Sequence, residues 1–238
     1  MTGGTRGIGL AAVRLFAGLG DTVHLTGRSA SLAADRAAEV AESTGASVHG
    51  HPLDLLDLAS VASLFDTFRA TRRGLDVLVA NAGHLEQGPV GAIPAPSAER
   101  LLDVNVLGTL ACVQAAARLM LPRRRGAMVL VGSAVGESGA AGQSAYAASK
   151  AAVTALARSA AKELGPRGIR VNVVAPGLID TELSSVLPEP AVDAYRQRAA
   201  LRRTGSADEI ARVIRFLAGD DASYLTGQLV TVDGGAGP

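Results

Sequence analysis

Short apolar runs alternate with longer amphipathic stretches along nearly the whole chain, and this alternation restricts the fold more than any other feature. Short runs bounded by Gly, Asn, Asp or Pro predict strands at residues 22–26, 47–49, 77–80, 128–131, 171–174 and 229–232. The stretches between them predict helices at residues 8–19, 31–43, 58–71, 97–121, 143–164 and 207–218. Such β–α alternation is typical of an α/β fold with a doubly wound parallel sheet and helices on both faces.

The chain has 238 residues, without a repeat, a low-complexity tract or an interdomain linker. This organisation predicts a single domain over residues 1–238. Its least regular segment is Gly177–Arg203, which we expect to act as a lid over a substrate. Ser97 and Ser206 are predicted helix N-caps, and Glu209 completes a capping box with Ser206.

Charge and composition exclude several classes of protein. With 23 Lys and Arg against 22 Asp and Glu, the chain lacks the basic excess of a nucleic-acid-binding protein. A single cysteine excludes a disulfide framework, and the histidines lack carboxylates at metal-ligand spacing, so no metal site is expected. No run of 18 apolar residues and no signal peptide were found, which predicts a cytoplasmic protein without a membrane partner.

Glycines at positions 3, 4, 7 and 9 precede the first predicted helix. Glycines allow a pyrophosphate to approach the backbone, and a helix N-terminus supplies free N–H groups. The spacing G-x-x-x-G-x-G differs from the usual G-x-G-x-x-G, however. Taken alone, it fits a glycine-rich turn at the start of a helix equally well.

Tyr146 and Lys150 form a more informative pair. They stand four residues apart in a predicted helix and therefore share one face. An ammonium beside a phenol lowers the phenol pKa, so the pair could exchange a proton with an alcohol or ketone. Ser133 ends the preceding strand, where its hydroxyl could bind the substrate oxygen. The alternative is an ordinary surface contact between tyrosine and lysine.

In combination, the motifs resemble those of the short-chain dehydrogenase/reductase family, in the family's order and over nearly the whole chain. The matching segments are Thr2–Gly9, Asn81-Ala82-Gly83, Asn105, Ser133, Tyr146–Lys150, Pro176-Gly177 and Asp233-Gly234-Gly235. The resemblance implies a Rossmann-like NAD(P)-binding domain that interconverts a ketone and a secondary alcohol. The alternative is a non-catalytic dinucleotide-binding or scaffold protein.

The resemblance also implies catalytic roles. Tyr146 would donate the proton when a ketone is reduced and accept it in the reverse direction. Lys150 would hold the nicotinamide ribose and lower the pKa of Tyr146. Ser133 would orient and polarise the carbonyl, and Asn105 would anchor a water that links Lys150 to solvent.

A larger set is expected to bind the cofactor. The resemblance implies that Asp54 meets the adenine amino group, that Thr181 binds the nicotinamide amide, and that residues 81–83 support the sheet beside the cofactor. The whole expected set is Gly3, Thr5, Arg6, Gly7, Ile8, Gly9, Arg28, Ser29, Asp54, Leu55, Asn81, Ala82, Gly83, Tyr146, Lys150, Pro176, Gly177 and Thr181.

The charges near the cofactor favour NADP(H) over NAD(H). NAD sites of this architecture carry an acidic residue at the end of the second strand, to bind the ribose hydroxyls. The corresponding stretch, Leu25–Ser29, has no acidic residue. Arg28 and Arg6 suit a 2′-phosphate instead. We therefore expect NADPH and a reductive direction, with NADH as the alternative.

Within the family, 3-oxoacyl-[acyl-carrier-protein] reductases resemble the chain most, over residues 140–177 and 202–227. That likeness implies docking of acyl carrier protein by Arg124 and Arg167. Both arginines also lie near helix ends, where cations offset the helix dipole. Because residues 84–96 depart from the subgroup's pattern, a reductase of small ketones or polyketide-like compounds is the alternative. The C-terminal motifs imply a homo-oligomer, either a tetramer or a dimer.

The family's sheet begins with a central apolar strand before the glycine-rich turn, whereas here only Met1 precedes Thr2. A central gap would leave strand edges unpaired, at about 1–3 kcal/mol for each buried backbone group. A net stability of about 5–15 kcal/mol cannot absorb many such losses. We therefore expect the natural start to lie upstream; without that strand the chain would fold poorly or bind its cofactor weakly.

Overall fold

The computed structural model describes residues 1–70, 74–182, 184–185 and 187–237. Its strands are β1 (Val23–Gly27), β2 (Val48–Pro52), β3 (Val77–Ala80), β4 (Gly126–Val131), β5 (Ile169–Pro176), β6 (Ile179–Asp180), β7 (Gly205–Ser206) and β8 (Leu229–Val232). Its α-helices are α1 (Gly7–Gly18), α2 (Ala30–Thr44), α3 (Leu58–Ala70), α4 (Ala95–Leu102), α5 (Thr109–Met120), α6 (Val135–Ser138), α7 (Ser144–Leu164), α8 (Glu189–Arg198) and α9 (Ala207–Ala218).

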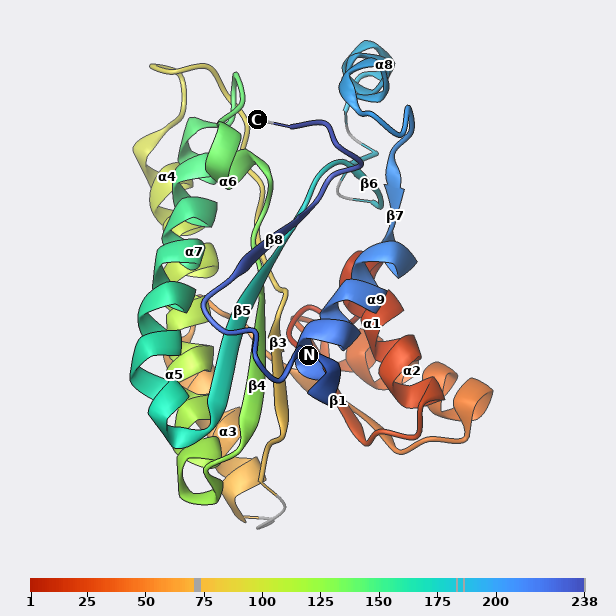
Figure 1. Ribbon diagram of the computed structural model, residues 1–238, viewed down its shortest axis with the longest axis vertical. Coiled ribbons are helices and arrows are strands. Elements are labelled where there is room, and N and C mark those ends of the chain that lie inside the picture. The colour runs from red at the N-terminus through yellow and green to blue at the C-terminus, as the bar shows by residue number, and fades with distance from the viewer. Residues whose placement is uncertain (71–73, 183, 186, 238) are drawn as a thin grey trace.

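All paired strands run parallel, as the β–α alternation predicts. β3, β4, β5 and β8 form one ladder in that order, and β1 and β2 form a second. Helices α3, α5 and α7 cover one side of the four-stranded ladder, whereas α1, α2 and α9 lie on the other side with β1 and β2 (Figure 1). The expected doubly wound α/β fold is therefore confirmed.

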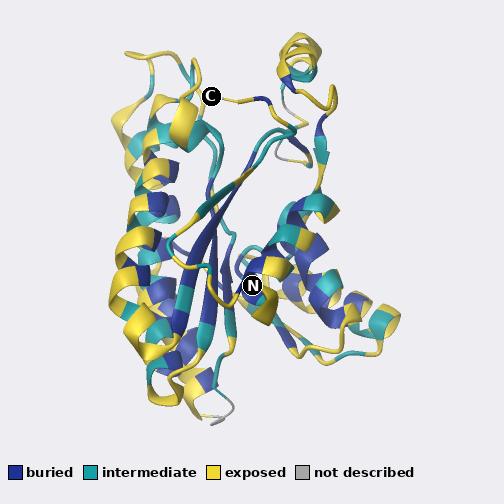
Figure 2. Cartoon of the chain, in the orientation of Figure 1, coloured by how far each residue is buried: buried dark blue, intermediate teal, exposed yellow. Residues whose placement is uncertain are grey.

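Side chains alternate across the central strands and divide the core in two. Leu78, Met128 and Val173 pack with α3, α5 and α7, whereas Val79 and Val129 pack with α1 and α9. This period of two is the geometry of a strand buried on both faces. Figure 2 shows the resulting continuous buried layer through the centre of the molecule.

The predicted helix over residues 97–121 is in fact interrupted. It consists of α4, a π-helical segment η1 (Asp103–Gly108) and α5. The predicted N-cap at Ser97 is wrong, because Pro94 is the N-cap and the helix begins at Ala95. Proline is compatible with the first turn of a helix, where an N–H has no partner within the helix, so the Pro94-Ala95-Pro96 segment starts the helix early.

The segment predicted to be irregular, Gly177–Arg203, contains β6 and α8. Its residues 183 and 186 lie outside the described part of the chain, as do residue 71 of the predicted helix 58–71 and residue 238 of the predicted domain. The predicted capping box at the start of α9 is confirmed: Ser206 accepts from the backbone N–H of Glu209, and the Glu209 carboxylate accepts from that of Ser206.

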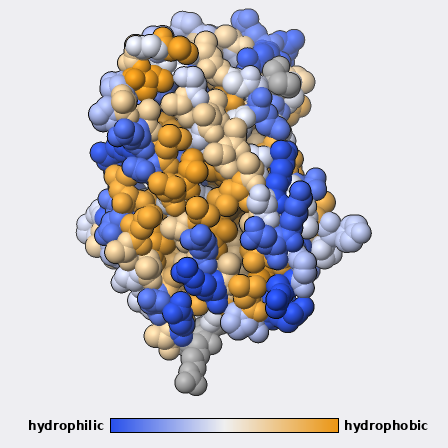
Figure 3. All heavy atoms as spheres, turned by 90° about the vertical axis from the view of Figure 1, so that its left-hand side faces the viewer, coloured by the Kyte–Doolittle hydropathy of each residue, from blue (hydrophilic) through white to orange (hydrophobic). Residues whose placement is uncertain are grey.

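Residues 95–123 are long and apolar enough to cross a membrane, with a mean hydropathy of 1.5 over the most apolar window. This run was not predicted from the sequence. Half of that window is buried inside the protein, which is how a core helix behaves. Figure 3 views the side formed by α4, α5 and α7 and shows apolar side chains gathered across it. Leu102 and Leu107, from α4 and η1, are exposed. We call this side the apolar face.

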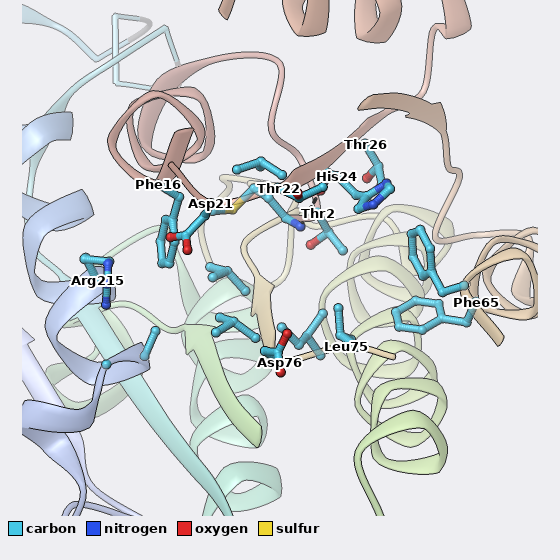
Figure 4. A pocket seen from close by; sticks show the side chains of 18 of the residues that line it. Thr2, Phe16, Asp21, Thr22, His24, Thr26, Phe65, Leu75, Asp76 and Arg215 are labelled. Atoms are coloured by element: carbon cyan, nitrogen blue, oxygen red, sulfur yellow. Dashed lines mark hydrogen bonds between the residues drawn. The ribbon is translucent and has the colours of Figure 1, made fainter. Parts of the chain in front are cut away.

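Residues 1–4 connect the two ladders. The Thr26 N–H donates to the Met1 carbonyl at 3.0 Å, and the Thr2 N–H donates to the Val79 carbonyl at 3.0 Å. The Met1 amino group donates to the carbonyl of His24 at 2.8 Å. Beside this connection lies a cavity of about 450 Å³ between β1 and β3 (Figure 4).

Candidate active site

A pocket of about 530 Å³ opens at the carboxyl ends of β3, β4 and β5, the usual location of ligands in open parallel sheets. It brings together residues that are far apart in the sequence. The predicted site residues along its wall are Ile8, Asn81, Gly83, Ser133, Tyr146, Lys150, Pro176, Gly177 and Thr181.

Lys150 lies in the second turn of α7 and is almost fully buried. Its Nζ donates to the carbonyl of Val131, the last residue of β4, at 2.9 Å, and lies 5.7 Å from the centre of the Tyr146 ring. Desolvation lowers its pKa from 10.5 to about 8. The predicted proximity of the Tyr146 and Lys150 side chains is confirmed.

The pKa of Tyr146 departs from the prediction. Burial raises it, and a hydrogen bond with Ser133 offsets part of that rise. The expected lowering by Lys150 is wrong for this state of the protein, because the ammonium is hydrogen-bonded to the Val131 carbonyl while burial penalises the phenolate. The phenol is therefore protonated at neutral pH.

Ser133 follows β4 and lies beside α6, the short helix before α7. Its Oγ accepts from the N–H of Val135 at 3.3 Å and hydrogen-bonds with Tyr146. Gly136 allows α6 to contact α7 closely, since a Cβ there would lie 3.0 Å from atoms of Lys150. This close packing brings the Ser133 and Tyr146 hydroxyls together in the pocket.

Asn105 lies in η1 and is buried beside Lys150. Its Oδ1 accepts from the His84 N–H at 2.7 Å, and its Nδ2 donates to the His84 carbonyl and to Ser149 Oγ. The side-chain amide is thus fully engaged in fixing the turn after β3. A π-helical segment disturbs the regular helical hydrogen bonds at this point.

The glycine-rich turn is fixed to the end of β3. Asn81 Nδ2 donates to the carbonyls of Thr2 and Gly3 at 3.1 and 3.0 Å. A Cβ at Gly9 would lie 2.1 Å from the Gly3 oxygen, and Gly7 has a φ of +52° while facing Thr181. These positions therefore require glycine, and the turn leaves the N-terminus of α1 next to the pocket.

The residues expected at the adenosine end lie on neighbouring strand ends. Arg28 follows β1 and is exposed. Ser29 caps α2 by accepting from the Leu32 N–H at 3.2 Å, a local role that the sequence analysis missed. The Leu53 N–H donates to the Gly27 carbonyl at 2.9 Å, which brings exposed Asp54 to the same edge.

Three other residues that were predicted to bind the cofactor, Thr5, Leu55 and Arg6, have different surroundings. Thr5 packs against Gly27, since a Cβ added to Gly27 would lie 2.6 Å from the Cγ2 of Thr5. Leu55 is buried in the core rather than exposed to a ligand. Arg6 is exposed and forms an ion pair with Glu182 at 3.1 Å, which links the glycine-rich turn to the segment after β6.

Two arginines predicted to dock a carrier protein lie near each other. Arg124 donates from its Nη2 to the carbonyl of Pro166 at 3.0 Å, directly before Arg167. In the described part of the chain, no group of three or more His, Cys, Asp or Glu residues is arranged to hold a metal ion.

The pocket also has walls that the sequence analysis did not assign. His84, in the turn after β3, lines the pocket. Tyr195 and Arg198 of α8 do so as well, and the Tyr195 hydroxyl donates to the Asp233 carbonyl at 2.7 Å. No sequence signal identified α8, because none of its residues is buried.

Comparison with known proteins agrees with this geometry. The model of a family described as Enoyl-(Acyl carrier protein) reductase matches residues 3–237. The 3-oxoacyl-[acyl-carrier-protein] reductase FabG of Aquifex aeolicus is 38% identical over 99% of this chain and 95% of its own length. FabG of Thermotoga maritima is 37% identical over the same shares.

A solved structure titled short chain dehydrogenase/reductase family protein has a TM-score of 0.89. It is 39% identical, and the match covers 99% of this chain and 94% of that one. These matches extend over both the glycine-rich turn and the Tyr146 region. The chain therefore belongs to the short-chain dehydrogenase/reductase family and is an oxidoreductase that interconverts a carbonyl and an alcohol with a nicotinamide dinucleotide.

Proposed function

We propose that this enzyme uses NADPH to reduce the 3-oxo group of an acyl thioester or a related small ketone. The observation that carries the proposal is the Tyr146 phenol, kept protonated by burial and hydrogen-bonded with Ser133 in the pocket. When bound, the nicotinamide supplies the hydride to the carbonyl carbon. Ser133 and Tyr146 bind the carbonyl oxygen, and Tyr146 transfers its proton to that oxygen.

Lys150 and Asn105 support the proton transfer by Tyr146. Lys150 binds the nicotinamide ribose, and its ammonium stabilises the phenolate left after proton transfer. Because the Asn105 side-chain amide is already engaged, its backbone carbonyl in η1 would hold the water that returns a proton through Lys150. Both residues therefore position groups and move protons without contacting the carbonyl.

The family likeness supports a proposal for the remaining cofactor contacts. Residues 3–9 would hold the pyrophosphate, and residues 81–83 would support the sheet beside the cofactor. Asp54 would bind the adenine amino group, and Thr181, beside Pro176-Gly177, would bind the nicotinamide amide. Arg28 and Arg6 bind the 2′-phosphate of NADP(H), which the absence of an acidic residue over 25–29 favours. Arg6 would exchange Glu182 for that phosphate.

One feature supports the proposed substrate and another supports the proposed oligomeric assembly. The relatives named above act on 3-oxoacyl groups carried by acyl carrier protein, an acidic partner suited to Arg124 and Arg167. The apolar face exposes Leu102 and Leu107, so we propose that it packs against a second copy in a homo-oligomer, either a dimer or a tetramer.

Replacing Tyr146 with Phe removes the transferable proton and preserves the ring. We expect NADPH oxidation with acetoacetyl thioester to fall by about 10²–10⁴-fold, while the Kd for NADPH changes by less than twofold. Tyr224→Phe is the matched control, since Tyr224 is fully exposed and lies in a loop. Retention of activity by Tyr146→Phe would rule out the assigned acid and favour a non-catalytic role for the pair.

Arg28→Ala tests cofactor choice. A charge-assisted hydrogen bond contributes about 1.5–3 kcal/mol, so the KM for NADPH should rise about 10–100-fold while the KM for NADH is unchanged. Arg14→Ala is the control, because Arg14 is exposed on α1 and pairs with Glu39. A wild-type enzyme that prefers NADH, or an equal loss for both cofactors, would overturn the assignment.

Lys150→Met separates stability from activity. The pKa of Lys150 falls from 10.5 to about 8 on folding, so the charged form weakens the folded state at pH 7. Methionine fills a similar volume without a charge, so the substitution removes the desolvation penalty and loses one hydrogen bond. Because the penalty is the larger of the two, we expect the free energy of unfolding at pH 7 to rise by about 1–2 kcal/mol.

The gain should disappear as pH rises from 8 to 10.5, because the folded wild-type lysine is neutral there while the unfolded one is still charged. Ketone reduction by Lys150→Met should be lost at every pH. Chemical denaturation and NADPH oxidation measured on the same samples test both statements, and a variant less stable than wild type at pH 7 would contradict the first.

A further inference from the structure

Helix α8 lies across the opening of the pocket from α6 and the start of α7 (Figure 1). None of its residues is buried. It nevertheless lines the pocket with Ala191, Ala194, Tyr195 and Arg198, which follow helical spacing on one face. A helix whose apolar stripe faces a pocket gains its packing partner when a ligand fills that pocket.

Tyr195 gives this wall a fixed geometry. Its hydroxyl donates to the Asp233 carbonyl at 2.7 Å, which ties α8 to the chain after β8. The guanidinium carbon of Arg198 lies 5.7 Å from the centre of the Tyr195 ring. Stacking of this kind holds a guanidinium in place and leaves its N–H donors free to bind an anion.

The other charged groups of the pocket wall are already engaged. Lys150 is bound to Val131, His84 lies 3.4 Å from Glu86, and the Asp233 carboxylate accepts from two backbone N–H groups. Within the described ranges, Arg198 is the one cation of the wall that has no ion pair or hydrogen bond.

A second arginine on α8 provides the contrast. Arg196 pairs with Glu189 at 2.8 Å and with Asp193 at 2.9 Å, and it does not line the pocket. One helix therefore carries an arginine neutralised by its own neighbours and, two residues later, an arginine left available at the pocket.

We propose that Arg198 is a specificity-determining residue that binds an anionic group of the substrate while the carbonyl lies at Tyr146. This inference rests on the ketoreductase function proposed above. A carboxylate and a phosphate both match the paired donors of a guanidinium. The anion would be either the carboxylate of a small oxo acid or a phosphate on the carrier of a thioester, and both would contact the same side chain.

Kinetics with a panel of substrates tests the proposal. Arg198→Ala should lower kcat/KM about 10-fold or more for an anionic substrate, mainly through KM, and change it less than twofold for neutral ethyl acetoacetate. For an anionic substrate, the kcat/KM of Arg198→Lys, which keeps the charge, should fall between the values of wild type and Arg198→Ala. Arg196→Ala should behave as wild type with every substrate.

Acetoacetate and acetoacetyl-coenzyme A separate the two sources of charge. A loss confined to acetoacetate identifies a carboxylate, and a loss confined to the coenzyme A thioester identifies a phosphate. The N-acetylcysteamine thioester lacks phosphate, so its kcat/KM should be the same for wild type and Arg198→Ala. Equal losses on neutral and anionic substrates, or no loss with either anion, would overturn the proposal.

Calorimetric titration of the NADP⁺ complex with 3-hydroxybutyrate and with coenzyme A gives a readout that needs no turnover. At least one of the two should bind about 10-fold more weakly to Arg198→Ala than to Arg196→Ala. If wild type reduces no ketone but this difference is found, the proposed reaction fails and the anion site stands. If wild type is active and the affinities are equal, only the anion site fails.

Discussion

The hydrogen bond between the buried ammonium of Lys150 and the carbonyl that ends β4 holds the site together. It joins the helix that carries Tyr146 to the strand that leads to Ser133. A buried charge of this kind costs free energy, which the depressed pKa of Lys150 reports. The surrounding packing, in which α6 approaches α7 at Gly136, keeps the lysine buried in spite of this cost.

The same burial reinforces the protonated form of the Tyr146 phenol. A desolvated tyrosine whose neighbouring ammonium is hydrogen-bonded to a backbone carbonyl is a proton donor at neutral pH, and the donor form is what carbonyl reduction requires. In the opposite direction the phenolate must form first. Its stabilisation then depends on the Lys150 ammonium turning from the Val131 carbonyl toward the phenol or on positive charge brought by the cofactor.

Sequence reasoning succeeded where a local pattern determines geometry. Helical spacing places Tyr146 and Lys150 together whatever the rest of the fold does, and short apolar runs identified the six longer strands. It failed where tertiary contacts decide. The interruption at η1 accompanies the hydrogen bonds that Asn105 makes to His84 and Ser149, two partners distant in sequence. The pKa of Tyr146 depends on burial, which spacing does not reveal.

Helix α8 shows why the substrate is harder to predict than the reaction. The reacting groups lie at the ends of strands whose positions are fixed by a buried sheet, so their types and spacing carry the information. The opposite wall is a helix without buried residues, which the Tyr195 hydroxyl and the backbone N–H groups of residues 200 and 201 tie to the chain after β8. Substitutions on its pocket face change what the pocket binds without disturbing the sheet. The reacting groups and the proposed anion site therefore lie on separate elements, and only the reacting groups lie at the ends of buried strands.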